Sequence, residues 1–322
     1  MQQKLFSLAL PAALSAALLA GCAATGPQDA GADPRFGAVS AQPLPFLYGR
    51  RLDSRAFTGA AYRSDIIDTD ALYKFPQTNV ITFEAGARSS WHRHGGMDIL
   101  VTAGEGILQI EGQPAQLLKK GDVASIPAGV RHWHGAAPGS YFQQIVIYDK
   151  SWKPSAAVKD GDNRVSDAFY KALKTVSAAS PKGRRDLSTF AVEDEVRNLP
   201  TFTGPVRLGK VLDKKNASGA EMIANVVFEP GSYNAWHEHE GGQILIVTDG
   251  VGFHQRAGEP VQVLYPGDVV KCPPGVRHWH GAAPGSRFAH LAVSPSPKKK
   301  RVQWYQPISR EEYLAIPVPG RN

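Results

Sequence analysis

Cysteine is scarce in this chain of 322 residues, which contains only two, Cys22 and Cys272. Two cysteines cannot build a disulfide framework, so the fold is not expected to depend on one. Long amphipathic runs are few, whereas there are 32 glycines and 24 prolines, a balance that favours short strands and many turns over helices. With 43% hydrophobic and 20% charged residues, the composition is typical of a soluble globular protein and not of a disordered one.

The N-terminus offers no apolar run long enough to span a bilayer comfortably. The run from Leu5 to Leu19 follows a single lysine and is typical of a secretory signal. It ends in Leu19-Ala20-Gly21-Cys22, which resembles the lipobox of bacterial lipoproteins. That resemblance implies a signal peptide over residues 1–22, and lipid attachment at Cys22 on the periplasmic side of the cell envelope. Ala23 follows the cysteine instead of aspartate, which points to the outer membrane. The alternative is an ordinary signal peptide with an unrelated cysteine.

Residues 23–45 are small, rich in glycine and proline, and without periodicity, which predicts a flexible tether between the lipid and the folded part. Contact with the membrane is therefore expected through the lipid alone. The formal net charge of +7 has local sources in residues 182–185 and 298–301. No recognition motif accompanies these basic runs and the protein is expected to be exported, so nucleic acid is not a predicted partner.

The folded part is one unit used twice. GVRHWHGAAPGS stands at residues 129–140 and returns letter for letter at 275–286. In each copy a serine, Ser166 or Ser309, precedes a short helical turn as its N-cap, and Ser309 with Glu312 forms a capping box. A period of about 145 residues indicates a domain duplication rather than a solenoid. We therefore expect one domain over residues 46–152, a connector with a short helix over 153–197, and a second domain over 198–318.

Within each unit the hydrophobic pattern alternates as it does in strands. Residues 99–102 and 106–110 are two such stretches, and residues 243–248 and 252–255 repeat them. Pro-Gly and Pro-x-Gly turns separate the stretches at short intervals. Many short strands at this spacing predict an all-β sandwich or small barrel in each unit.

Eight of the ten histidines lie in two HxH pairs and two HWH triplets. Residues i and i+2 of a strand point to the same face, so each pair presents two imidazoles to one side. An oxygen-bearing side chain follows four residues after each pair, and a further histidine follows a Pro-x-Gly turn. Three imidazoles and one oxygen suit a borderline divalent metal such as Mn, Fe, Co, Ni, Cu or Zn. The residues are His92, His94, Asp98 and His132 in the first unit, and His237, His239, Gln243 and His278 in the second.

The spacing of these residues resembles the two motifs of the cupin superfamily, once in each unit. The resemblance implies a bicupin, with two tandem antiparallel jelly-roll barrels that each hold a metal, manganese or iron first among the candidates. The second unit is similar to manganese cupins of the hydroxynitrile-lyase and carboxymuconolactone-decarboxylase-associated type, which implies that His237, His239, Gln243 and His278 are ligands. The second histidine of each triplet, His134 or His280, is then a pocket residue that hydrogen-bonds or moves a proton.

Both units depart from the glutamate that most cupins carry at the oxygen position. Asp98 is one methylene shorter. Gln243 is neutral and leaves the charge of the ion uncompensated, which makes the second site the stronger Lewis acid and favours an anionic substrate or bound hydroxide there. The two halves are therefore expected to differ in function.

Three functions stay open at this point. The first is a metal-dependent enzyme, a dioxygenase or a lyase or isomerase, that acts on a small oxygenated substrate with His280 and His134 as catalytic residues. The second is a non-catalytic envelope protein that binds a metal or a ligand. The third is a structural cupin that uses its metals for folding only. A homo-oligomer is also left open.

Overall fold

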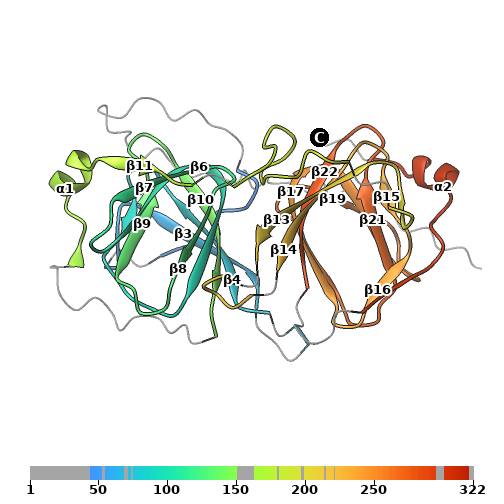
Figure 1. Ribbon diagram of the computed structural model, residues 1–322, viewed down its shortest axis with the longest axis horizontal. Coiled ribbons are helices and arrows are strands. Elements are labelled where there is room, and N and C mark those ends of the chain that lie inside the picture. The colour runs from blue at the N-terminus through green and yellow to red at the C-terminus, as the bar shows by residue number, and fades with distance from the viewer. Residues whose placement is uncertain are drawn as a thin grey trace, which may run out of the picture. The chain divides into compact units, whose positions relative to one another are not determined.

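Figure 1 shows the computed structural model, in which strands form two barrels in succession along the chain. The structure describes residues 44–52, 55–68, 72–73, 75–150, 163–179, 181–196, 199–213, 215–220, 222–294 and 301–318. The predicted signal peptide, Cys22 and nearly all of the predicted tether lie outside these residues. In the described part, no helix is both long and apolar enough to cross a membrane.

The first barrel is antiparallel, and its longest strand, β6, passes from one sheet to the other. The first part of β6 pairs with β8 and β10, and its second part pairs with β7 and β9. The strands are β1 (Arg50–Arg51), β2 (Phe57–Thr58), β3 (Ala61–Ile67), β4 (Thr78–Phe83), β5 (Arg88–Ser89), β6 (Met97–Ile110), β7 (Ala115–Lys119), β8 (Val123–Ile126), β9 (His132–Ala136) and β10 (Phe142–Tyr148). A further strand, β11 (Thr175–Ser177), comes from the predicted connector and pairs parallel with β7.

The second barrel repeats this plan, with β17 and β18 together in the place of β6. β17 pairs with β20 and β22, and β18 pairs with β19 and β21. The strands are β12 (Phe202–Thr203), β13 (Val206–Leu212), β14 (Ile223–Phe228), β15 (Tyr233–Asn234), β16 (His237–His239), β17 (Gln243–Gly250), β18 (Gly252–Arg256), β19 (Gln262–Leu264), β20 (Val269–Cys272), β21 (His278–Ala282), β22 (Phe288–Val293) and β23 (Val302–Trp304).

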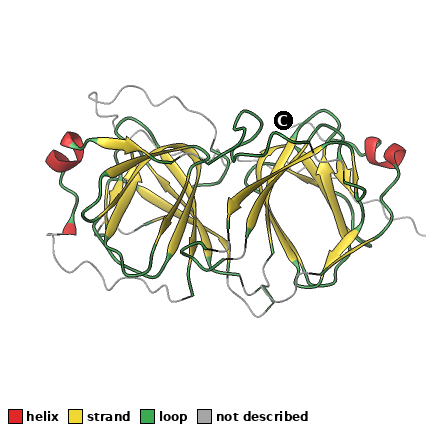
Figure 2. Ribbon diagram, in the orientation of Figure 1, coloured by secondary structure: helices red, strands yellow, loops and turns green. Residues whose placement is uncertain are grey.

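Two short helices, red in Figure 2, are the helices of the described chain: α1 (Asp167–Ala172) and α2 (Arg310–Leu314). Ser166 and Ser309 cap them as predicted, and Ser309 forms the capping box with Glu312. Each helix buries one tyrosine against the outer face of its barrel. The Tyr170 hydroxyl donates to the Ala136 carbonyl (2.6 Å) and the Tyr313 hydroxyl to the Ala282 carbonyl (2.7 Å). The predicted all-β fold of two tandem jelly-roll barrels with short closing helices is confirmed.

One hydrophobic core joins the facing sheets of the two barrels. All positions of β4 and β10 are buried, because one set of alternate side chains fills the first barrel and the other set packs against the second. On β6, Ile99 and Val101 belong to the barrel interior whereas Leu100 belongs to the core shared with the second barrel. The shared core contains Val80, Leu100, Ile145, Ile147, Ile223, Ile244, Ile246, Leu291 and Val293, among others. The parity of a residue on these strands therefore decides whether it faces a site or the other barrel.

Candidate metal centres

The HWH triplets lie on β9 and β21, where successive side chains point to opposite faces, so the histidines and the tryptophan of each triplet have different surroundings. His132 and His134 point into the first barrel, whereas Trp133 between them is fully buried on the outer side and packs against Tyr170 of α1. Trp279 packs in the same way against Tyr313. The tryptophans are thus packing residues, as their position between two inward histidines indicates.

Backbone pairing brings each HxH pair to its triplet. In the first barrel, His92 and His132 exchange both backbone hydrogen bonds (2.9 and 3.0 Å). The turn before the triplet contributes a second link, because the Gly129 amide donates to the His94 carbonyl (2.8 Å). Gly129 has φ of +75° there, a left-handed conformation that glycine adopts without the cost that a side chain would add. The second barrel is held alike, with the Gly275 amide donating to the His239 carbonyl (3.0 Å).

The imidazoles are oriented so that one nitrogen of each is held and the other faces the cluster. Nδ1 of His92, His132, His237 and His278 donates to a backbone carbonyl two residues earlier in the chain, at 2.7 to 2.9 Å. That bond places the hydrogen on Nδ1 and leaves the lone pair on Nε2. Nε2 of His132 and of His239 is buried without a hydrogen-bond partner among the described residues. Buried polar atoms rarely stay unpartnered, so these atoms fit ligands of an ion.

The ligand atoms converge in both barrels. Atoms of His92, His132 and His134 lie within 4.8 Å of one another, and so do atoms of His237, His239 and His278. The ring of His94 is 4.7 Å from that of His132. The described residues thus contain two histidine clusters that could each hold a metal ion.

Burial keeps these imidazoles neutral. Desolvation lowers the pKa of His92 to about 3 and that of His132 to about 4, and for His92 the neighbouring His132 adds to the effect. In the second barrel the same cause lowers the pKa of His239 to about 4 and the pKa of His278 below its usual value. Neutral imidazole is the form that binds a metal, so both clusters are ready to bind at neutral pH.

Gln243 lies beside the second cluster. It is the first residue of β17, and its Oε1 lies 2.9 Å from Nε2 of His278. Because Nδ1 of His278 donates to Val276, its Nε2 and the amide oxygen both present lone pairs, so His237, His239, His278 and Gln243 can supply three nitrogens and one oxygen to an ion.

Asp98 does not join the first cluster, and its prediction as a metal ligand is wrong. It is fully buried on the face of β6 that is shared with Leu100 and turned toward the second barrel. Its Oδ1 accepts from the Ser125 hydroxyl and from the Ala217 amide, and its Oδ2 accepts from the Ser218 amide (2.8 Å). Both carboxylate oxygens are therefore engaged between the barrels.

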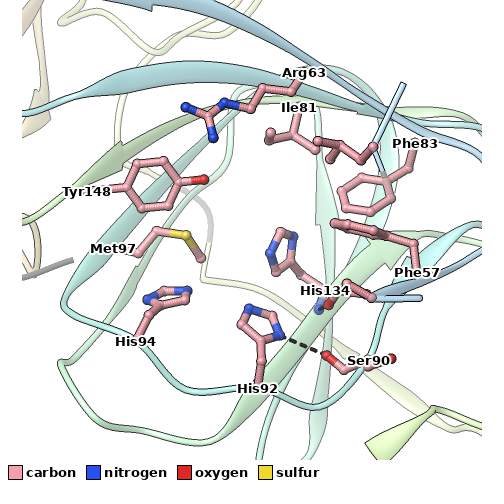
Figure 3. A pocket seen from close by; sticks show the side chains of 13 residues that line it. Phe57, Arg63, Ile81, Phe83, Ser90, His92, His94, Met97, His134 and Tyr148 are labelled. Atoms are coloured by element: carbon pink, nitrogen blue, oxygen red, sulfur yellow. Dashed lines mark hydrogen bonds between the residues drawn. The ribbon is translucent and has the colours of Figure 1, made fainter. Parts of the chain in front are cut away.

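Met97 occupies the place that corresponds to Gln243. Met97 pairs with Ile126 as Gln243 pairs with Cys272, in the same register of the two barrels. The second unit has one extra residue, Glu240, between its HxH pair and the glycine pair, and this residue shifts the count by one. Figure 3 shows the Met97 side chain in the first cavity near His94. Four imidazoles and a thioether thus surround the cavity of the first barrel, and no carboxylate is among the described residues that line it.

The second histidines of the triplets have different partners in the two barrels. In the first, the Gln144 amide donates to Nδ1 of His134 (2.9 Å), which places the hydrogen of the neutral ring on Nε2. In the second, Asn234 donates to Nε2 of His280 (3.0 Å), and the ring of His290 stands 4.8 Å away in place of the amide of Gln144. Burial lowers the pKa of His134 and His280 well below the usual value.

Further polar side chains of the second barrel interior belong to neither cupin motif. His254 and His290 are fully buried, and Nε2 of His254 lies 3.1 Å from the Cys272 sulfur. Burial raises the pKa of the Cys272 thiol to about 12, so it stays protonated. The cysteine is buried and protonated, as an inert structural thiol would be.

Comparisons with known proteins agree with this geometry. A family model described as Cupin domain matches residues 79–144 and 224–293. The chain is 44% identical over 112 residues to an (R)-mandelonitrile lyase of Granulicella tundricola, which is 35% of this chain and 85% of that protein. It is 30% identical over 148 residues to Germin-like protein subfamily T member 3 of Arabidopsis thaliana, covering 44% of this chain and 57% of that protein. Among solved structures, oxalate decarboxylase from Bacillus subtilis aligns with a TM-score of 0.51 over 83% of this chain and 79% of that chain, at 16% identity, which is a likeness of fold alone.

Proposed function

Since the chain belongs to the cupin superfamily and contains two cupin domains, we propose that it is a metal-dependent lyase of small oxygenated molecules, with the reaction in the second barrel. The observation that carries the proposal is the set of His237, His239, Gln243 and His278: the three imidazoles have ligand atoms within 4.8 Å of one another, and the amide oxygen lies 2.9 Å from Nε2 of His278. The sequence leaves open a dioxygenase, a lyase or an isomerase, and the 44% identity to a mandelonitrile lyase favours the lyase.

The substrate class that we propose is a 2-hydroxynitrile. A divalent ion held by the three imidazoles and the amide, with manganese or iron first among the candidates, would act as a Lewis acid on the substrate oxygen. His280 lies beside this set, its ring 5.4 Å from that of His237. A neutral imidazole has a lone pair that can accept a proton, so His280 can act as a general base.

The reaction can be written with its protons balanced. Nε2 of His280 takes the proton of the substrate hydroxyl in exchange for its hydrogen bond from Asn234. The C–C bond to the nitrile carbon breaks, the electron pair leaves with cyanide, and the oxygen becomes the carbonyl of an aldehyde. The proton on His280 then passes to cyanide, which leaves as hydrogen cyanide. We propose the equivalent position in the first barrel, His134, as a proton-carrying residue of that cavity.

The test is benzaldehyde release from mandelonitrile by the full chain loaded with Mn²⁺ or Fe²⁺. We expect metal-dependent turnover that falls by about 100-fold or more in His280→Ala, the usual contribution of a general base. Arg310→Ala, at an exposed position on α2, should keep the rate. Metal-loaded protein that binds the nitrile and releases no aldehyde would instead identify a non-catalytic binding protein of the cell envelope.

We also propose that the chain is an exported lipoprotein anchored through Cys22, on the evidence of residues 1–22. Metabolic labelling with palmitate should mark the wild type and not Cys22→Ser, and this variant should leave the membrane fraction. Cys272→Ser is the matched control, because that thiol is buried inside a barrel, and it should stay labelled. Retention of Cys22→Ser in the membrane fraction would contradict the anchor.

A further inference from the structure

The first barrel contains a cavity of about 250 Å³ whose two ends differ in chemistry. His92 and His134 lie at one end, Figure 3 shows Arg63 at the opposite end, and the Tyr148 ring lies along the side, 6.1 Å from the ring of His94. Leu52, Phe57, Ile81 and Phe83 line the space as well. The volume is below the range of about 300–1,000 Å³ that pockets for drug-sized ligands have, so the ligand has to be small.

Arg63 brings a permanent positive charge to this largely apolar space. Two bonds hold its guanidinium: Nε donates to Asp65 (2.7 Å) and Nη2 donates to Asn79 (3.2 Å). Only 15% of the side chain is exposed, whereas Asp65 is 40% exposed, so the counter-charge is on the solvent side. An arginine fixed in this way is preorganised for an anion inside the cavity.

Two further donors stand beside the guanidinium. Tyr148 lines the cavity between His94 and Arg63 and hydrogen-bonds Asn79. Asn79 is fully buried, and its Oδ1 accepts from the guanidinium of Arg63. The phenol and the buried amide therefore form one polar group with the guanidinium, and an anion at Arg63 would lie within reach of their donors.

The second barrel lacks this group of donors. Arg63 pairs with Ile81 in the first barrel, and Leu208 pairs with Val226 at the equivalent positions of the second. A leucine therefore replaces the arginine there. The same register places Ala224 at the position of Asn79. Ser294 follows the end of β22 where Tyr148 ends β10. The donors are therefore a property of the first barrel and not a remnant of the common unit.

We propose that the first barrel binds a small organic carboxylate, with the carboxylate at Arg63, Tyr148 and Asn79 and an apolar body against Phe57, Ile81 and Phe83. The site extends the proposed function, because it gives the first barrel a ligand class of its own, separate from the neutral hydroxynitrile of the second. A guanidinium can hold both oxygens of a carboxylate, and an aryl or short alkyl group fits the apolar wall.

Calorimetric titration of the metal-loaded full chain with benzoate tests the proposal, with benzyl alcohol as the uncharged probe of similar shape. Arg63→Leu, which copies Leu208, should weaken benzoate binding by about tenfold or more, since it removes charge-assisted hydrogen bonds. Arg51→Leu removes the same charge from an exposed position on β1 and should leave benzoate binding unchanged. Binding of benzyl alcohol should be the same in all three proteins.

Arg63→Gln and Tyr148→Phe keep the experiment decisive if the leucine variant does not fold, and both should weaken benzoate binding. Equal affinity for benzoate in the wild type and in the Arg63 variants would overturn the proposal, as would an equal loss in Arg51→Leu. Aldehyde release by the second barrel is measured in the same samples and should not change. A failure of the lyase proposal is thus distinguishable from a failure of the carboxylate site.

Discussion

Replacing His278 by alanine will remove about half of the divalent metal that the full chain holds, and replacing His132 as well will remove nearly all of it. His278 is central to the second cluster, with its ring 4.3 Å from that of His237 and its Nε2 2.9 Å from Gln243. Alanine supplies no donor atom, so only three ligands remain. The loss of a residue that merely orients a ligand already lowers metal affinity by about 10–100-fold. The loss of a ligand itself should therefore release the ion.

Metal content is measured by mass spectrometry on the purified full chain after dialysis. Arg277→Ala is the matched control, since this neighbouring side chain stacks on the Tyr305 ring at 3.7 Å and does not belong to the cluster. It should keep the metal content of the wild type. Full metal content in His278→Ala would show that the histidine is not a ligand.

Local rules predict the fold and most of the site because both depend on strand alternation. A residue between two inward histidines has to face outward, so the sequence alone assigns Trp133 and Trp279 to packing, and both are fully buried on the outer side. The Pro-x-Gly turns and the serine caps are likewise short-range features, and the structure has them at the predicted positions.

Asp98 is predicted as a ligand only if residues are counted along the chain without allowing for an insertion in the second unit. Asp98 and Gln243 each stand four positions after the last histidine of their pair, but the second unit has Glu240 as an additional residue in that interval. Aligning the glycine pairs instead matches Met97 with Gln243 and places Asp98 with Ile244, which faces the other barrel. A shift of one residue on a strand reverses the face, so the error changes the chemistry of the site completely.

The remaining site residues carry no signal that can be read from one sequence. Arg63, Asn79 and Tyr148 lie on three strands that are far apart along the chain and belong to no motif. Only the pairing of β3 with β4 and of β4 with β10 brings them together. Gln144 and His290 likewise belong to no motif. Their roles depend on the triplet histidine that each one contacts, His134 for Gln144 and His280 for His290.

Replacing Asp98 by alanine will destabilise the protein by about 3 kcal/mol or more and leave the metal content of both barrels unchanged. The variant removes the acceptor of the Ser125 hydroxyl and of the Ala217 and Ser218 amides. The Ser218 amide then stays buried without an acceptor, and each such buried donor costs about 1–3 kcal/mol. Asp98→Asn keeps one acceptor oxygen and should lose less stability than the alanine variant.

Calorimetric unfolding measures the loss of stability, and the same samples serve for metal analysis. Asp186→Ala is the control, because that carboxylate is exposed and its ion pair with Arg184 lies at the surface, where its removal should change the unfolding temperature little. A variant that loses metal from the first barrel while its stability is unchanged would restore Asp98 as a ligand and contradict its role between the barrels.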